Sequence, residues 1–208
     1  MKEFAPGSEM REPGTIEYPI IDSAMTIEEA LRPNPDFFLE PEIFEKQILL
    51  KVMYLSFDGK YHQGQIVIDK DLETDVKDFF NFLIEQGFPL NRAVPIAHEK
   101  YNFEDTLSMA DNNSSGLNPR NIEGTDRPSN HAYGRAIDLN PFQNPFIKNE
   151  VIEPKGAKYD IKEAGTFSAE SPVVQFLISR GWKWGGDYQE IKDYHHFEKP
   201  SKKPEHGQ

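Results

Sequence analysis

The chain has 208 residues, a length that fits one domain with a buried core more easily than two. It contains no cysteine, which excludes disulfides, thiolate metal sites, iron–sulfur clusters and cysteine nucleophiles, so any metal must be held by imidazole and carboxylate groups. The formal net charge of −12 argues against nucleic-acid binding, which requires a basic surface.

The sequence indicates one folded unit between two irregular ends. Gly, Pro and Glu dominate the start, which predicts a loosely ordered arm over 1–24, a single domain over 25–200 and a tail over 201–208. No apolar run approaches the roughly 20 residues that span a bilayer, so we expect no stable membrane insertion. Residues 1–14 contain no apolar stretch typical of a secretory signal.

The first elements of the domain are short. Residues 26–32 predict a helix, and the apolar stretches 49–57 and 65–69 predict two strands. Between these strands, Asp58-Gly59 predicts a hairpin with a type I′ turn, which needs positive φ at both central residues.

The strongest helix signal covers residues 71–87. Apolar side chains at helical spacing predict a face buried in the core, with Asp71 or Thr74 as the cap. Gly87 falls where a helix is expected to end.

The second half of the chain is less regular. Residues 93–98 predict a strand, and the polar stretch 102–130 predicts a long loop, a feature that is often functional in a compact domain. Residues 168–181 predict a second long helix, with Ser168 or Ser171 as its cap. Because strands and helices mix without a regular βαβ alternation, the sequence favours the α+β class.

Three histidines stand near acids in polar strings that contain glycine: His131, His195 and His196. A catalytic zinc ion takes about three protein ligands and leaves one position open for water. Without cysteine, two histidines and one aspartate form a chemically sensible set. Histidines also form ordinary surface pairs with acids, so spacing alone does not decide between a metal site and such pairs.

The first string needs a bend to form a site. His131 and Asp138 are seven residues apart, so on one unbroken strand their side chains would face opposite sides. Gly134 lies between them and can supply a turn or bulge that brings both to one ion.

The second string pairs an acid with a histidine. Asp193 precedes His196 by three residues, so a tight turn or a single helical turn places both on one side. A carboxylate there can take a proton from metal-activated water and deliver it to a leaving amine. His195 and His196 are adjacent, so on an extended segment one of them faces the ion.

At these residues the chain resembles peptidase family M15, the zinc D-alanyl-D-alanine carboxypeptidases and L-alanyl-D-glutamate endopeptidases. The family pattern Ser-x-His-x-x-Gly-x-Ala-x-Asp is matched by Ser129, His131, Gly134, Ala136 and Asp138. A later pattern, Trp-Gly-Gly-Asp and then Asp-x-x-His-Phe, is matched by Trp184 to Asp187 and by Asp193, His196 and Phe197. The resemblance runs loosely from Val52 to Phe197 and does not cover the first fifty residues.

The resemblance implies a site. Its zinc ion (Zn²⁺) would be held by His131, Asp138 and His196, with Asp193 as general base and acid. Many members have proline just before the last ligand, where this chain has His195.

Arginine in the polar loop has an implied role in catalysis and substrate binding. Family members use an arginine upstream of the first ligand to hold a substrate carboxylate or carbonyl, and Arg120 matches that place better than Arg127. Ser129 either binds substrate or shapes its turn. Trp182 and Trp184 are expected in the core and the wall of the substrate pocket rather than as sugar-stacking platforms, and Trp184 is the candidate for substrate binding. Asp187 either braces a ligand histidine or caps a turn.

The resemblance also implies a fold and a function. The fold would be hedgehog-like α+β, with a central antiparallel sheet flanked by helices. The activity would be hydrolysis of amide bonds in peptidoglycan stem peptides by metal-activated water, at a D-alanyl-D-alanine or an L-alanyl-D-glutamate bond, outside the cytoplasm in the periplasm or cell wall. Two alternatives are a non-catalytic cell-wall binding module, which would not need Asp193, and a zinc peptidase with a different peptide substrate.

Overall fold

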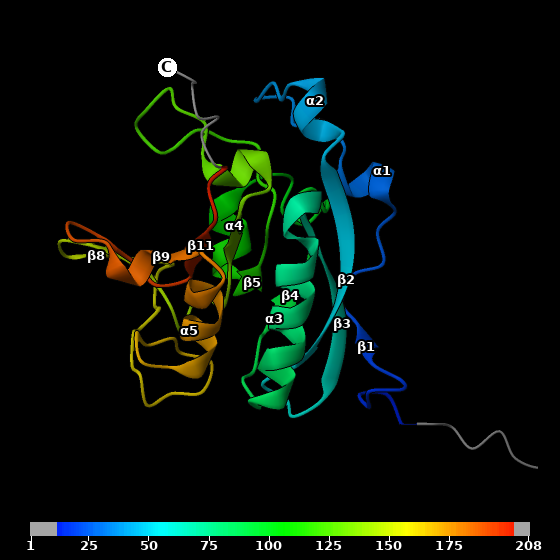
Figure 1. The fold of residues 1–208 in the computed structure, drawn as a ribbon, viewed down its shortest axis with the longest axis vertical. Helices are drawn as coiled ribbons and strands as arrows, with labels where there is room; N and C mark the ends of the chain where they lie inside the picture. The colour runs from blue at the N-terminus through cyan, green and yellow to red at the C-terminus, as the bar shows by residue number, and fades with distance from the viewer. Residues whose placement is uncertain (1–11, 202–208) are drawn as a thin grey trace, which may run out of the picture.

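The computed structural model describes residues 12–201 of the chain (Figure 1). The first eleven residues of the expected arm and residues 202–208 of the expected tail lie outside that range. Within it, helices and short strands mix without alternation, which confirms the α+β class. The strands of the described residues form four small sheets rather than one central sheet. None of the helices in residues 12–201 has the length and apolar character needed to cross a membrane.

A long antiparallel hairpin forms the largest of these sheets (Figure 1). Its strands are β2 (Gln47–Leu55) and β3 (Tyr61–Asp69), and β1 (Ile20–Ile21) pairs in parallel with the free edge of β3. The strand β1 lies in the segment expected to be loosely ordered, because this pairing uses backbone groups and leaves no periodic side-chain pattern. The hairpin itself is confirmed.

The turn of the hairpin differs from the predicted type I′ turn. Gly59 has a φ of +78°, but Asp58 is not among the residues with positive φ. The Asp58 carboxylate instead accepts a hydrogen bond from the Lys60 amide at 2.9 Å. An aspartate that bonds its own backbone two residues on stabilises a turn in which the aspartate itself is not left-handed.

The helix α3 (Glu73–Glu85) packs its apolar face on the hairpin (Figure 1). The short helix η1 (Lys70–Leu72) precedes it, and Asp69 caps η1, so the predicted caps Asp71 and Thr74 are wrong. Gly87, with a φ of +61°, follows the end of α3 as expected. Four side chains of α3 are buried in the core, Val76, Phe79, Phe80 and Leu83.

The other long helix, α5 (Pro172–Ser179), lies beside α3. Ser171 caps it by accepting from the amide of Val174, which selects Ser171 over Ser168. Near the N-terminus, α1 (Ile27–Ala30) is capped by Thr26 and confirms the predicted short helix. A further single turn, α2 (Pro41–Phe44), leads into β2.

The segment after α3 is less regular than predicted in one place and more regular in another. Only β4 (Arg92–Ala93) forms from the predicted strand 93–98, because Pro95 has no amide hydrogen for a ladder. The predicted loop 102–130 contains the helix α4 (Asp105–Ala110) and β5 (Asn113–Ser114), which pairs in parallel with β4.

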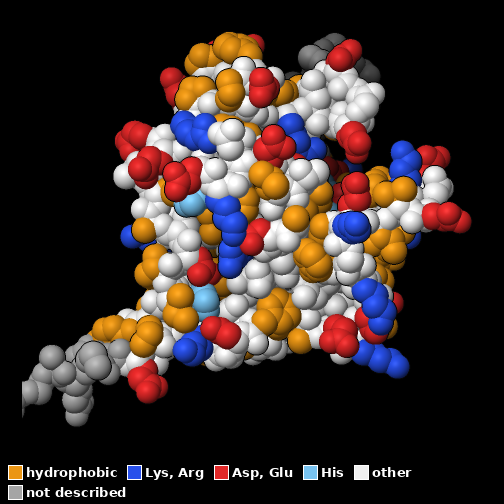
Figure 2. Space-filling model, turned by 180° about the vertical axis from the view of Figure 1, so that it is seen from behind, with side chains coloured by type: hydrophobic (Ala, Val, Ile, Leu, Met, Phe, Trp, Pro, Cys, Tyr) orange, Lys and Arg blue, Asp and Glu red, His pale blue; other side chains and the backbone are white. Residues whose placement is uncertain are grey.

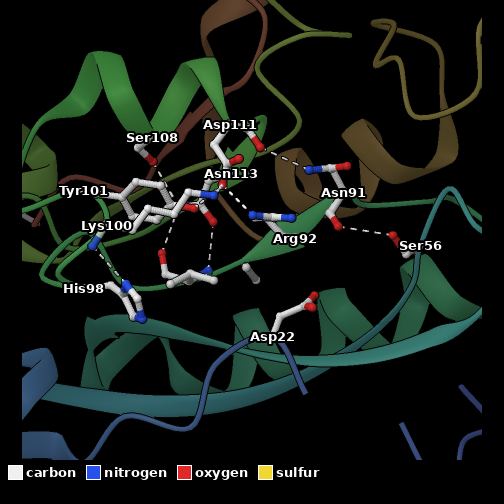
Figure 3. Close-up of polar contacts among 12 residues, drawn as sticks. Asp22, Ser56, Asn91, Arg92, His98, Lys100, Tyr101, Ser108, Asp111 and Asn113 are labelled. Carbon is white, nitrogen blue, oxygen red and sulfur yellow. Dashed lines mark hydrogen bonds and ion pairs between the residues drawn. The ribbon is translucent and has the colours of Figure 1, made fainter. Parts of the chain in front are cut away.

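Asp111 fixes the segment between β4 and β5 (Figure 3). Its Oδ2 accepts from Arg92, Lys100 and Tyr101, each at 2.6 Å. Burial raises the pKa of Asp111, but the hydrogen bonds from Lys100 and Tyr101 and the charge of Arg92 outweigh it and lower that pKa. This network anchors the start of β5, and the chain that continues from β5 reaches the functional site at Gly116.

We expect Asp111→Asn to lower the free energy of unfolding by about 1–3 kcal/mol at neutral pH, because three donors lose a charged acceptor. The pKa of Asp111 is lower in the folded state than in the unfolded state. Its contribution is therefore present above the ordinary carboxyl pKa of about 4 and is lost as the pH falls through the folded value. Urea unfolding of both proteins at several pH values should show the stability difference shrinking in acid. A difference that stays constant down to low pH would contradict this account.

Two small sheets carry the rest of the strands. One has the order β6–β11–β9, all antiparallel, and the other has the order β10–β7–β8. Their bounds are β6 (Ala136–Asp138), β7 (Phe146–Lys148), β8 (Val151–Glu153), β9 (Lys183–Trp184), β10 (Lys192–Asp193) and β11 (His196–Glu198). Two single-turn helices accompany them, η2 (Asn130–Tyr133) and η3 (Gly185–Asp187).

On the face shown in Figure 2, acidic and basic side chains are interspersed, with small groups of hydrophobic side chains between them. The net negative charge of the chain is therefore not gathered into a single patch on that face.

Candidate metal centre

Three buried side chains, His131, Asp138 and His196, converge on one point and could hold a metal ion. Nε2 of His131 lies 3.1 Å from Oδ2 of Asp138 and 3.1 Å from Nδ1 of His196. Nδ1 of His196 lies 3.0 Å from Oδ1 of Asp138. Ligand atoms of a tetrahedral zinc ion lie about 3.3 Å from one another, since each is about 2.0–2.1 Å from the ion. The spacing of the three side chains fits such an ion.

Local backbone structure brings the three together. His131 lies on η2, where Ser129 caps the turn by accepting from the amide of His131 at 3.2 Å. Gly134 ends η2 with a φ of +63°, and β6 then carries Asp138 to the position directly opposite His196 on β11. Residues directly opposite in an antiparallel pair present their side chains on the same face.

Only glycine fits at position 134. A Cβ there would lie 2.0 Å from Oε1 of Gln47 and 2.7 Å from the backbone nitrogen of Asp69. The bend that the sequence predicted between His131 and Asp138 thus depends on positive φ and on a close approach to the β2–β3 hairpin.

Hydrogen bonds determine which ring nitrogen of each histidine faces the cluster. Nδ1 of His131 lies 2.7 Å from the carbonyl oxygen of Gly116, which can only accept, so Nδ1 carries the hydrogen and Nε2 faces the cluster. Nε2 of His196 lies 3.4 Å from Oε2 of Glu198, which leaves Nδ1 toward Asp138. Metal-bound histidines commonly donate their second nitrogen to an acceptor in this way.

The charges around the cluster favour a cation. Burial raises the pKa of Asp138, but the charges of His131 and His195 and hydrogen bonds from the histidines hold that pKa well below its ordinary value. Burial lowers the pKa of His196, but hydrogen bonds to Asp138 and Glu198 raise it to about 10. The cluster therefore stabilises positive charge, which either a proton or a metal ion can supply.

Glu198 is a functional candidate that our sequence analysis missed. It accepts from Nδ2 of Asn130 at 2.6 Å and faces His196, and these contacts lower its pKa to about 2. The available signal was its position two residues after His196, which on a strand places both side chains on one face.

We expect Glu198→Gln to weaken metal binding about 10- to 100-fold, the usual effect of losing an acceptor behind a ligand histidine. Titration against a chromophoric chelator would measure the affinity. Glu190→Gln is the matched control, because Glu190 is an exposed acid that precedes β10 and does not line the cavity. Equal affinities for Glu198→Gln and the control would show that Glu198 does not orient His196.

Asp193 and His195 lie beside the cluster and line the same cavity. Asp193 ends β10 and His196 begins β11, so a tight turn joins them, one of the two predicted arrangements. His195 is not part of the cluster, and its Nε2 lies 3.0 Å from Oδ1 of Asp193. The structure therefore brings His196, and not His195, to the cluster.

In the pair formed by Asp193 and His195, each side chain shifts the pKa of the other toward its charged form. Burial lowers the pKa of His195, but the charges of Asp193 and Asp138 raise it to about 9. Burial raises the pKa of Asp193, but the charge of His195 outweighs it and lowers that pKa. A carboxylate thus stands ionised next to the cluster.

The cavity has a volume of about 420 Å³ and opens to solvent, and both Arg120 and Ser129 line it. Nη2 of Arg120 lies 3.2 Å from Oδ2 of Asp105, another residue of the cavity wall. The buried Nε of Arg120 has no hydrogen-bond partner among the described residues. Arg127 is exposed and does not line the cavity.

The structure does not bring Trp184 to the cavity, so its predicted role in the pocket wall is replaced by one in the core. Its side chain is 3% exposed, its ring packs on Phe197, and its Nε1 donates to the carbonyl of Tyr194 at 2.8 Å. Gly185 lets the chain pass close to Asp193, because a Cβ at Gly185 would lie 2.4 Å from the Asp193 carbonyl oxygen. The tryptophan–glycine motif therefore supports the turn between Asp193 and His196.

Asp187, the last residue of that motif, is exposed. Its carbonyl accepts from Nε2 of Gln189 at 3.0 Å, and no hydrogen bond or ion pair joins its side chain to the histidines of the cluster within residues 12–201. The expectation that Asp187 braces a ligand is therefore not met.

Residues 123–199 match the sequence model of a family described as D-alanyl-D-alanine carboxypeptidase. The match confirms the resemblance to peptidase family M15 over this stretch, which contains the three cluster residues and Asp193. Arg120 lies just outside it, and the looser resemblance expected from Val52 onward is not part of the match. No solved structure gives a significant match to the chain.

Proposed function

We propose that this chain, whose residues 123–199 resemble peptidase family M15, is a zinc-dependent peptidase that hydrolyses amide bonds of peptidoglycan stem peptides. The observation that carries the proposal is the convergence of His131, Asp138 and His196 on one point, next to a cavity that both histidines and Asp193 line. The bond that is cut would be D-alanyl-D-alanine or L-alanyl-D-glutamate.

The donor set favours zinc. Two imidazole nitrogens and one carboxylate suit zinc better than magnesium or calcium, which prefer oxygen ligands alone. The bound ion would supply a Lewis acid that polarises the scissile carbonyl and activates water.

Asp193 would move the proton. Its ionised carboxylate lines the cavity that contains the cluster, so it can accept a proton from the attacking water and return it to the leaving amine. A pure binding module has no use for a carboxylate at this place, which is why we favour catalysis.

Arg120 would hold the substrate. Its ion pair with Asp105 engages one side of the guanidinium, and its buried Nε still lacks a partner among the described residues. The Arg120 side chain is 32% exposed and lines the cavity, so its accessible N–H groups could donate to a substrate carboxylate or carbonyl. Ser129 accepts from the amide of His131 and still has a hydroxyl hydrogen to offer to substrate.

The proposal includes a location and a fold. The enzyme would act outside the cytoplasm, in the periplasm or cell wall, where its substrate lies. Its domain, residues 25–200, would belong to the hedgehog-like group of α+β folds.

Mass spectrometry of two defined peptides would test the function. One peptide ends in D-Ala-D-Ala, and the other contains the L-alanyl-γ-D-glutamyl bond. We expect the zinc-loaded chain to cleave one of them, with loss of cleavage in chelator and recovery on addition of zinc. Binding of both peptides without cleavage would contradict catalysis and favour a binding module. Equal cleavage of unrelated peptides would contradict the choice of substrate.

A further inference from the structure

We propose that His195 is a positioning residue that holds the carboxylate of Asp193 in place. This inference rests on the proposed function, because it concerns the residue to which that proposal assigns proton transfer. It assigns a role to a histidine that stands next to the cluster but is not part of it.

The ring of His195 is fixed on both sides. The residue is 4% exposed, and its Nδ1 lies 2.8 Å from the carbonyl oxygen of Asn144. A carbonyl can only accept, so Nδ1 donates, and the ring then presents Nε2 to Oδ1 of Asp193 at 3.0 Å. Oδ1 of Asp193 has no hydrogen-bond partner among the described residues, so the contact with His195 is an ion pair.

Asn144, whose carbonyl contacts His195, is itself held by hydrogen bonds. Asn144 is fully buried, and its Nδ2 donates to the carbonyl of Gly165 at 2.9 Å. Its Oδ1 accepts from the amide of Phe167 at 2.7 Å. A chain of contacts thus runs from the buried loop around Gly165 through Asn144 and His195 to Asp193.

The backbone of His195 is also tied to the metal-ligand strand. Its carbonyl accepts from the amide of Leu139, the residue after Asp138, at 3.1 Å. The same residue therefore connects to the ligand strand through its backbone and to Asp193 through its ring. This arrangement fixes the carboxylate of Asp193 relative to the cluster.

Within residues 12–201, the ion pair with His195 is the only side-chain contact of this type that the carboxylate of Asp193 makes. Among the described residues, His195 alone makes an ion pair with its carboxylate, and no other side chain hydrogen-bonds to it. Its Oδ1 is buried while 20% of the side chain stays exposed, so the exposed part lies away from His195 and is accessible from the cavity. Without His195, the side chain could rotate into other conformations.

The experiment compares His195→Leu with His195→Gln in the zinc-loaded full chain. Leucine fills the space without a donor, whereas the amide nitrogen of glutamine can reach the position of Nε2. Since a small misplacement of a catalytic group can cost about 10²-fold, we expect His195→Leu to lower kcat by about 10- to 100-fold. KM and zinc content should stay unchanged, and His195→Gln should recover most of kcat.

A double variant separates positioning from a merely structural role. In an Asp193→Ala background, His195→Leu should lower kcat no further, because both changes remove the same contribution. A further loss in the double variant, an unchanged kcat in His195→Leu or an equal loss in both His195 variants would overturn the proposal.

A crystal structure of His195→Leu keeps this inference distinct from the proposed function. We expect the Asp193 side chain to adopt a different rotamer or several rotamers in the variant. An unchanged, single rotamer would overturn the positioning role even if the chain cleaved no wall peptide. Conversely, an inactive wild type with a displaced Asp193 in the variant would contradict the proposed function alone.

Discussion

Replacement of His131 by alanine is expected to lower kcat/KM by roughly 10³-fold or more and to abolish stoichiometric zinc binding. The loss follows from the geometry of the cluster, in which Nε2 of His131 faces both Asp138 and His196 at 3.1 Å. A bound metal ion contributes several kcal/mol of charge stabilisation in the transition state, and each 1.4 kcal/mol or so corresponds to about a tenfold change in rate.

Metal analysis and peptide hydrolysis on the same protein samples would measure both effects. His98→Ala is the control, because His98 is a partly buried histidine that does not line the cavity beside the cluster. Thermal unfolding should show that both variants are folded. If His131→Ala kept one zinc ion per chain and normal turnover, the assignment of the ligands would have to be abandoned.

Replacement of Asp193 by asparagine is expected to reduce kcat by about 10²- to 10⁴-fold, the range typical of general acid–base groups. Zinc content should be unchanged, because Asp193 is not one of the three residues of the cluster. Asparagine preserves the shape of the side chain but cannot accept the proton. Both variants should therefore lose turnover, but Asp193→Asn should keep its zinc ion whereas His131→Ala should not.

Asp187→Asn serves as the control for Asp193→Asn. Asp187 is an exposed acid six residues upstream, and among the described residues no hydrogen bond or ion pair joins its side chain to the histidines of the cluster. We expect it to keep wild-type turnover on the peptide that the wild type cleaves. Full activity of Asp193→Asn, or equal losses in the two variants, would exclude Asp193 as the proton carrier.

The long elements of the fold were predictable because each carries its own pattern. The β2–β3 hairpin has extended apolar stretches on both sides of Asp58-Gly59, and α3 has four buried residues at helical spacing. The strands near the site are only two or three residues long, as in β7 and β10. Strands of that length show no periodicity, and distant parts of the chain determine where they form.

The site was predictable where its chemistry is local. The glycine between His131 and Asp138 and the three-residue spacing between Asp193 and His196 are visible in the sequence. Trp184 shows the limit of this reasoning, because a tryptophan beside an active site is equally suited to the core and to a pocket wall.

Residues that contact the site residues without belonging to the cluster were not predictable from the sequence. Glu198 faces His196 because β11 pairs with β6, and His195 is held by a carbonyl 51 residues away in sequence. Such contacts depend on tertiary structure, and no spacing within one segment indicates them.

The central claim is that one zinc ion is bound jointly by His131, Asp138 and His196. Anomalous diffraction at the zinc absorption edge, from a crystal of the zinc-loaded chain, would test it most directly. We predict one strong peak between Nε2 of His131, the carboxylate of Asp138 and Nδ1 of His196. A zinc peak elsewhere, with these three side chains still bonded only to one another, would contradict the account.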